Sequence, residues 1–211
     1  MSAHNTIQIH LLTNAQVFPD DNYLSFIEVC ARSGITHLQL RQKNWAYSDL
    51  LSFGRELKAI FSSYDVRLII NDDFKLMLEL DADGIHLGQS DSNPKLVRQE
   101  VGEDKIIGLS IESMNELLLA NQLDCLDYVA ASSVFPTDTK KNLKTIWGID
   151  GLQLFCQQSR HPVIAIGGIN LTHISQVYSA GVTGIALISA IHEAANPSLY
   201  IQNLINQIKF L

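Results

Sequence analysis

Two acidic residues follow short apolar segments, at positions where a divalent cation could bind. Asp72 comes after Ile69-Ile70-Asn71, and Asp91 comes shortly after His86-Leu87-Gly88. Two carboxylates that lie close together repel each other, and a hard divalent cation relieves this repulsion because it accepts oxygen ligands. We therefore expect Asp72 and Asp91 to bind Mg2+. A turn or helix-cap role is the alternative for Asp91, and Asp73 is expected to cap the following helix.

A small number of cations could bind phosphate in a chain whose formal charge is −7. Arg41 and Lys43 stand together after the apolar segment that includes Gln39, and Lys140 follows Thr137 and Thr139. Lysine and arginine pair with phosphate oxygens, and threonine hydroxyls add neutral hydrogen bonds. These segments are therefore candidate anion sites, with solvent-exposed basic loops as the alternative.

Glycines and a serine follow three further apolar segments. Gly167-Gly168 follows Ala165-Ile166, Ser189 follows Ile188, and Ser110 follows Leu109. Glycine lets backbone N–H groups approach an anion, although a tight turn without ligand has the same composition. The sequence has no Ser–His–acid, His-Glu-x-x-His or Cys–His motif in its usual context, so covalent nucleophilic catalysis is not indicated.

The elements that must position these residues alternate between strands and helices. Short runs of Val, Ile and Leu predict buried strands, and apolar residues at three- and four-residue spacing predict helices between them. Eight strands are expected: Ile7–Thr13, Thr36–Arg41, Arg67–Asn71, Gly84–Gly88, Lys105–Ser110, Tyr128–Val134, Pro162–Gly167 and Gly184–Ser189. Eight helices are expected: Tyr23–Arg32, Tyr47–Ser62, Phe74–Leu80, Pro94–Val101, Met114–Leu123, Ile149–Gln158, Leu171–Ala180 and Ser198–Ile208.

This alternation predicts an α/β fold, a single (β/α)8 TIM barrel over residues 1–211. A doubly wound open sheet is the alternative, but no Gly-x-Gly-x-x-Gly turn follows the first strand. In a barrel, the candidate residues would meet at the carboxyl ends of the strands, and the loops after strands seven and eight often bind phosphate.

The composition narrows the class of protein. Hydrophobic residues make up 46% and charged residues 18%, which is typical of globular proteins. The apolar runs are too short to span a membrane, and the N-terminus does not have the pattern of a signal peptide, so we expect a cytoplasmic protein. The acidic balance argues against binding to nucleic acid.

In their order along the chain, these motifs resemble the thiamine-phosphate synthase family over nearly the whole sequence. The resemblance is carried by Gln39-Leu40-Arg41-Gln42-Lys43, Asn71-Asp72-Asp73, Gly84 to Asp91, Gly108-Leu109-Ser110, Pro136 to Lys141, Ala165 to Ile169 and Ile188-Ser189. It implies a transferase that joins 4-amino-5-hydroxymethyl-2-methylpyrimidine diphosphate to 4-methyl-5-(2-phosphoethyl)thiazole. The products would be thiamine phosphate and pyrophosphate, formed by a dissociative, Mg2+-assisted substitution.

The resemblance also implies roles for individual residues. Two small phosphorylated molecules would be the partners, and a homo-oligomer is left open. Catalytic roles would fall to Ser110, Lys140 and Arg41. The pyrimidine diphosphate would contact Gln39, Arg41, Lys43, Asn71, Lys140 and Ser110, with Asp72 and Asp91 on Mg2+. The thiazole phosphate would contact Thr137, Thr139, Gly168, Ile188 and Ser189.

Two positions depart from the family pattern. Ala131-Ser132-Ser133 stands where a Gly-Pro pair is usual, and His10 stands where Tyr is frequent. Alternative functions are a thiazole tautomerase-like isomerase, a sugar-phosphate isomerase or epimerase, and a non-catalytic barrel that binds phospholigands. The tautomerase would not need Asp72, Asp91 and Lys140.

Overall fold

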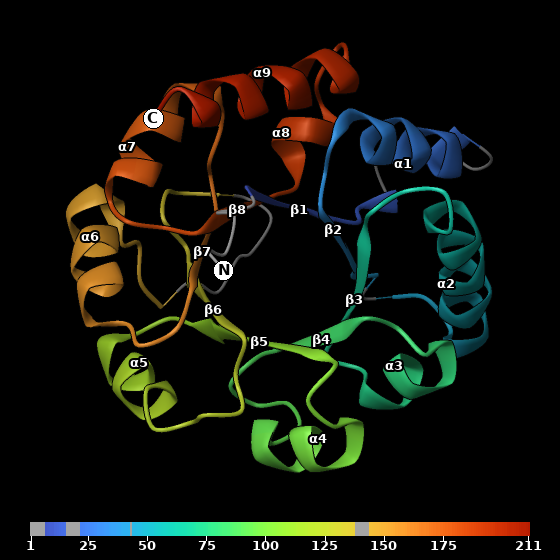
Figure 1. Ribbon diagram of the computed structural model, residues 1–211, viewed down its shortest axis with the longest axis horizontal. Coiled ribbons are helices and arrows are strands. Elements are labelled where there is room, and N and C mark those ends of the chain that lie inside the picture. Colours follow the sequence, from blue (N-terminus) through green and yellow to red (C-terminus); the bar gives the residue numbers. More distant parts are fainter. Residues whose placement is uncertain (1–6, 16–21, 43, 138–143) are drawn as a thin grey trace, which may run out of the picture.

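Eight parallel strands close into a barrel in the computed structural model, which describes residues 7–15, 22–42, 44–137 and 144–211. Each strand pairs in parallel with the next, and β8 pairs with β1, so the (β/α)8 prediction is confirmed (Figure 1). The strands are β1 Gln8–Leu12, β2 His37–Leu40, β3 Arg67–Asn71, β4 Gly84–Leu87, β5 Ile106–Ile111, β6 Tyr128–Ser132, β7 Val163–Ile166 and β8 Gly184–Leu187.

Helices form a ring outside the strands, and the last helix, α9, packs beside the first, α1 (Figure 1). They are α1 Asn22–Ser33, α2 Tyr47–Phe61, α3 Phe74–Leu80, α4 Pro94–Val101, α5 Met114–Ala120, α6 Gly148–Gln158, the 3-10 helix η2 Leu171–His173, α7 Ile174–Ser179, α8 Ser189–His192 and α9 Pro197–Lys209. Within the described ranges, no helix has the length and apolar character needed to cross a membrane.

Most expected boundaries differ from the observed ones by one to three residues, and two of these differences have a clear structural cause. Ser189 is the first residue of the short helix α8 and does not belong to β8, because strand pairing ends at Leu187 and the Ile188 carbonyl instead accepts hydrogen bonds from helix N–H groups. The helix expected from Leu171 to Ala180 begins as η2, whose first turn is capped when Asn170 Oδ1 accepts the Thr172 N–H at 2.9 Å.

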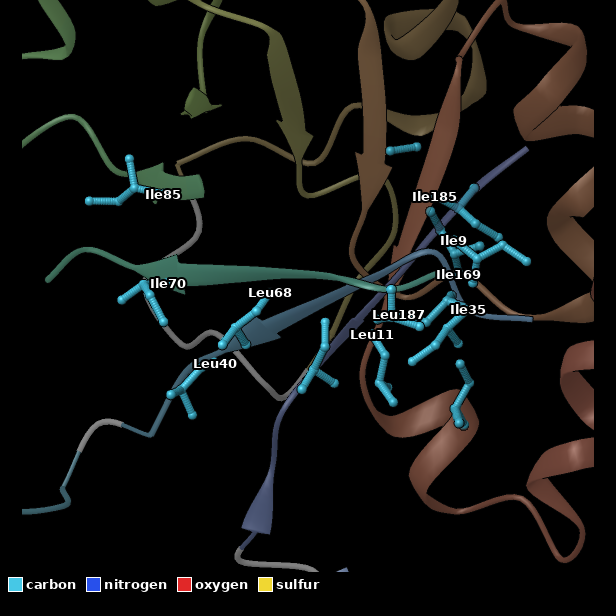
Figure 2. Packing of buried hydrophobic residues seen from close by; sticks show 14 of the residues in the cluster. Ile9, Leu11, Ile35, Leu40, Leu68, Ile70, Ile85, Ile169, Ile185 and Leu187 are labelled. Atoms are coloured by element: carbon cyan, nitrogen blue, oxygen red, sulfur yellow. The ribbon is translucent and has the colours of Figure 1, made fainter. Parts of the chain in front are cut away.

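Alternate residues of the strands face outward and pack against the helices. Figure 2 shows part of this layer, in which Ile9 and Leu11 of β1 lie near Ile185 and Leu187 of β8. All four side chains are at most 2% exposed. Burial on this scale is the main term that stabilises the fold, at about 1.5–3 kcal/mol for each large aliphatic side chain.

The other set of alternate residues faces the barrel interior. An inner apolar cluster is formed by Leu12, Tyr128, Ala130, Ile164 and Ala186, separate from the outer core. Because side chains alternate along a strand, each inward position is followed by another two residues later, nearer to the carboxyl end. This period places Gln39 and Arg41, Ser110 and Glu112, and Ile166 and Gly168 toward one mouth.

Candidate active site

One pocket of about 510 Å3 opens at the carboxyl ends of the strands. It is lined by ten of the predicted site residues: Gln39, Arg41, Asn71, Asp72, Asp91, Ser110, Thr137, Gly168, Ile188 and Ser189. The other three predicted residues, Lys43, Thr139 and Lys140, lie outside the residues that the structure describes. The fold therefore gathers residues from several βα units that are far apart in the sequence.

Hydrogen bonds between neighbouring strand ends fix the β2 side of the pocket. Gln39 Nε2 donates to Asn71 Oδ1 at 2.9 Å, and the Gln39 side chain is buried. At the end of β1, Thr13 Oγ1 accepts the Arg41 N–H at 2.8 Å and donates to the Arg41 carbonyl. Burial lowers the pKa of Arg41, an effect that the nearby Asp72 carboxylate opposes. Arg41 is thus a fixed cation in a partly desolvated position.

The two predicted metal ligands reach the pocket in different ways. Asp72 follows β3 with a φ of 63°, in the left-handed region that aspartate tolerates better than most residues. Its N–H donates to the His86 carbonyl at 2.9 Å, which extends the β3–β4 pairing to this residue. Asp91 Oδ2 accepts the Gly88 N–H at 2.6 Å, so Asp91 does stabilise a turn. Asp73 caps α3 as predicted, because its Oδ1 accepts the Leu76 N–H.

Asp72 and Asp91 provide oxygen donors, the type of ligand that magnesium takes. No group of three or more His, Cys, Asp or Glu suited to a metal occurs in the described ranges. Magnesium typically takes one or two carboxylates and completes its coordination with water and substrate phosphate oxygens. Asp72 and Asp91, which line the same pocket, supply carboxylates of that kind.

Ser110 is connected to a buried histidine and a tyrosine. His86 Nε2 lies 2.8 Å from Ser110 Oγ, and His86 Nδ1 lies 2.8 Å from the Tyr128 hydroxyl. Gln89 Nε2 donates to the Ser110 carbonyl at 2.7 Å. His86 is thus a packed, hydrogen-bonded histidine that also lines the pocket.

Two glycines shape the opposite side of the pocket. Gly167 and Gly168 have φ values of 101° and 64°, which favour glycine over other residues. A Cβ atom on Gly168 would lie 2.6 Å from the Pro136 carbonyl oxygen. The loop after β6 packs against this turn, since the Phe135 N–H donates to the Gly167 carbonyl at 3.0 Å. The turn therefore leaves backbone accessible to a ligand.

Several pocket residues were not predicted. His10 lines the floor and stacks on His37, with ring centroids 4.0 Å apart and planes inclined by 7°. Glu112 is buried at the wall, and Lys144 Nζ lies 3.0 Å from Glu116 Oε1 at the mouth. Strand periodicity could have found Glu112, since it stands two residues after Ser110. Nothing in a single sequence shows that two histidines from neighbouring strands stack.

The unusual segment Ala131-Ser132-Ser133 lies at the end of β6. Ser132 and Ser133 line the pocket, and the Ser132 carbonyl accepts the Trp147 indole N–H at 3.2 Å. Ser133 Oγ donates to the Phe135 carbonyl at 2.7 Å. The serines therefore form hydrogen bonds within the loop on the glycine-turn side of the pocket.

The pocket is chemically divided. The described residues from β2 to β5 supply charged and polar groups, including Arg41, Asp72 and Ser110. The β6 to β8 side supplies the aliphatic side chains of Ala130, Ile164, Ile166, Ala186 and Ile188, and its rim adds the polar residues Ser132, Ser133, Thr137, Lys144 and Ser189. One side suits an anionic group, and the other suits an apolar ring with a polar group at the rim. In many (β/α)8 barrels the loops after strands seven and eight at this face bind phosphate.

Comparison with known proteins defines the class more narrowly. The family model for Thiamine monophosphate synthase matches residues 9–191. Thiamine-phosphate synthase of Chlamydia abortus is 41% identical over 194 residues, which cover 92% of this chain and 91% of the relative. The Vibrio parahaemolyticus relative of the same name is 39% identical over 195 residues, covering 92% and 94%.

Comparison with solved structures indicates the same family as the sequence comparison. Thiamine phosphate pyrophosphorylase from Pyrococcus furiosus superimposes with a TM-score of 0.85 at 30% identity, covering 98% of this chain and 97% of that one. The chain belongs to the thiamine monophosphate synthase family.

Proposed function

We propose that this chain joins 4-amino-5-hydroxymethyl-2-methylpyrimidine diphosphate to 4-methyl-5-(2-phosphoethyl)thiazole, giving thiamine phosphate and pyrophosphate. The observation that carries the proposal is the divided pocket, in which Arg41, Asp72 and Ser110 face the aliphatic wall from β6 to β8. A reaction between a diphosphate ester and a phosphorylated aromatic ring needs both surfaces in one cavity.

In the proposed step, the bond between the pyrimidine methylene carbon and the diphosphate oxygen breaks, and its electron pair leaves with pyrophosphate. The thiazole nitrogen then donates its lone pair to the methylene cation and forms the new C–N bond. When bound, Mg2+ neutralises charge that develops on the leaving group.

The protein's own residues hold the two reactants in line. In this proposal, Arg41 and the Ser110 hydroxyl would stabilise the departing pyrophosphate, and Gln39 with Asn71 would orient the pyrimidine. Asp72 and Asp91 would hold the metal. Thr137, Gly168, Ile188 and Ser189 would receive the thiazole phosphate. Electrostatic stabilisation and alignment account for catalysis without a general base.

The test is pyrophosphate release by the purified protein with both substrates, with and without Mg2+. We expect release only when both substrates and the metal are present. An isomerase of the thiazole would release no pyrophosphate, and a barrel that only binds phospholigands would bind the substrates without turnover. Either result would overturn the proposal. Lys43, Thr139 and Lys140 keep their predicted roles in this scheme and can be tested by substitution in the same assay.

Two wider expectations stay predictions: a cytoplasmic location and a possible homo-oligomer. The second can be measured by size-exclusion chromatography with light scattering.

A further inference from the structure

His192 is buried directly behind the turn that ends β8. It is the last residue of α8 and is 4% exposed, and it stands one helical turn after Ile188 and Ser189, which line the pocket. Its Nδ1 atom lies 2.8 Å from the Ile188 carbonyl oxygen. Its Nε2 atom lies 2.9 Å from the hydroxyl of Tyr23, a residue of α1.

The partners of the ring fix its tautomer. A carbonyl oxygen can only accept, so His192 Nδ1 carries the hydrogen and donates to Ile188. The Asn14 N–H can only donate, and it reaches the Tyr23 hydroxyl oxygen at 2.7 Å. The Tyr23 hydrogen is then directed to His192 Nε2. A chain of hydrogen bonds thus runs from Asn14, after β1, to the turn after β8.

The surroundings favour this neutral ring. The rings of Tyr23 and Phe26 pack against His192 with centroids 5.8 Å and 5.0 Å away. Burial lowers the pKa of His192, and the hydrogen bond to the Ile188 carbonyl and the nearby Glu193 carboxylate oppose this shift. Phe53 stacks on the same aromatic group, 6.0 Å from the Tyr23 ring. The imidazole is therefore held in one position.

The turn at Ile188 needs such support from outside. Helix α8 has four residues, and a single helical turn is not stable by itself because its nucleus is costly to form. Besides the imidazole, the Ile188 carbonyl accepts the N–H groups of Ile191 and His192, both at 3.2 Å. The side-chain bond from His192 is the shortest of the three.

We propose that His192 is a positioning residue that, together with Tyr23, holds the Ile188–Ser189 turn in the conformation that receives the phosphate of the second substrate. The inference rests on the proposed function, which assigns this phosphate to the turn. His192 lies behind the turn on the side of α1, outside the lining of the described pocket, so it acts through Ile188. Its loss should weaken binding of the thiazole phosphate and leave the diphosphate side unchanged.

The experiment compares three variants in the chain of hydrogen bonds that runs through Tyr23 and His192. His192→Phe keeps an aromatic ring and removes both nitrogens, Tyr23→Phe removes only the hydroxyl, and His192→Asn keeps an N–H donor near the position of Nδ1. We expect His192→Phe to raise the KM for the thiazole phosphate about fivefold, the change that corresponds to loss of one hydrogen bond of ~1 kcal/mol. Tyr23→Phe should give a smaller increase, and His192→Asn should recover most of the affinity.

The KM for the pyrimidine diphosphate and kcat should stay within about twofold of the wild type in all three variants. Tyr64→Phe is the matched control, because its hydroxyl donates to Glu28 at the exposed surface. This control should change neither KM. Thermal unfolding of each variant shows whether the fold is retained, and Tyr23→Phe carries the test if His192→Phe does not fold.

Calorimetric titration with the thiazole phosphate alone measures the same effect without turnover. A wild-type protein that binds this compound but releases no pyrophosphate would reject the proposed function, and the positioning role would then be decided by the binding measurement. An unchanged affinity in His192→Phe, or an equal loss for both substrates, would overturn the positioning role.

Discussion

His86 Nε2 lies 2.8 Å from Ser110 Oγ, and the same ring binds the Tyr128 hydroxyl through Nδ1. Burial raises the pKa of Tyr128, so its hydroxyl keeps its proton. If Tyr128 donates to His86 Nδ1, then His86 Nε2–H donates to Ser110, and the serine hydrogen is directed into the pocket.

This arrangement predicts a graded effect on pyrophosphate release. Ser110→Ala should lower kcat by roughly 100-fold, as is typical when a donor to a developing negative charge is lost. Tyr128→Phe leaves Ser110 in place and should lower kcat by about fivefold, the value of one hydrogen bond. Steady-state kinetics measure both. Equal rates for Tyr128→Phe and the wild type would show that Tyr128 does not orient the serine.

The metal assignment predicts that Asp72→Ala and Asp91→Ala each lower pyrophosphate release by at least about 100-fold while the fold survives. Asp91→Asn is the sharper variant, because it keeps an oxygen that can accept the Gly88 N–H and removes the charge. Asp104→Ala, before β5 at the opposite end of the barrel, is the control. Wild-type turnover in either alanine variant would remove that residue from the metal site.

Gly168→Ala should reduce both stability and affinity for the thiazole phosphate. Alanine in the left-handed region costs roughly 1–2 kcal/mol, and its Cβ would also meet the Pro136 carbonyl. Gly148 has a φ of 60°, close to that of Gly168, and a Cβ there would meet no atom within 4 Å among the described residues beyond its chain neighbours. Gly148→Ala therefore measures the cost of a positive φ without the contact. Chemical denaturation of both variants measures the difference, and equal losses would show that the contact with Pro136 is relieved at no cost.

Buried histidines predict loss of stability in acid. Burial lowers the pKa of His37 to about 4 from 6.5, and burial with the neighbouring His37 lowers the pKa of His10. At pH values between 6.5 and the lowered pKa of each histidine, the unfolded chain binds more protons than the folded chain. The free energy of unfolding therefore falls as the pH decreases below 6.5. The slope is up to about 1.4 kcal/mol per pH unit for each histidine. Urea denaturation from pH 7 to pH 4.5 tests this, and His37→Gln should reduce the slope.

The sequence was most informative where the structure depends on neighbouring residues, as in strand periodicity and helix capping. Strand periodicity and the polar residues after each strand were enough to predict eight strands, closure and the face that carries the site. Asp73 could be recognised as a helix cap from its position before an apolar run. The short helix α8 was missed, because four residues carry too little periodicity to distinguish them from the end of a strand.

Contacts between distant residues were beyond the reach of a single sequence. Tyr23 and His192 are 169 positions apart, and their hydrogen bond depends on ring closure bringing α1 next to α8. The His10–His37 stack depends on the register of β1 against β2, in which these two residues are partners. Such pairings follow from three-dimensional packing and leave no local pattern.

The aliphatic wall from β6 to β8 would contact the thiazole, which is the nucleophile in the proposed reaction. The residues that would activate the pyrimidine diphosphate lie on the other side of the pocket. Exchanging Ile164, Ile166 or Ala186 for larger or smaller aliphatic residues would reshape the cavity for the acceptor ring and leave Arg41 and Asp72 untouched. The barrel is therefore a scaffold on which catalysts could be engineered to couple one activated pyrimidine to other aromatic nitrogen compounds.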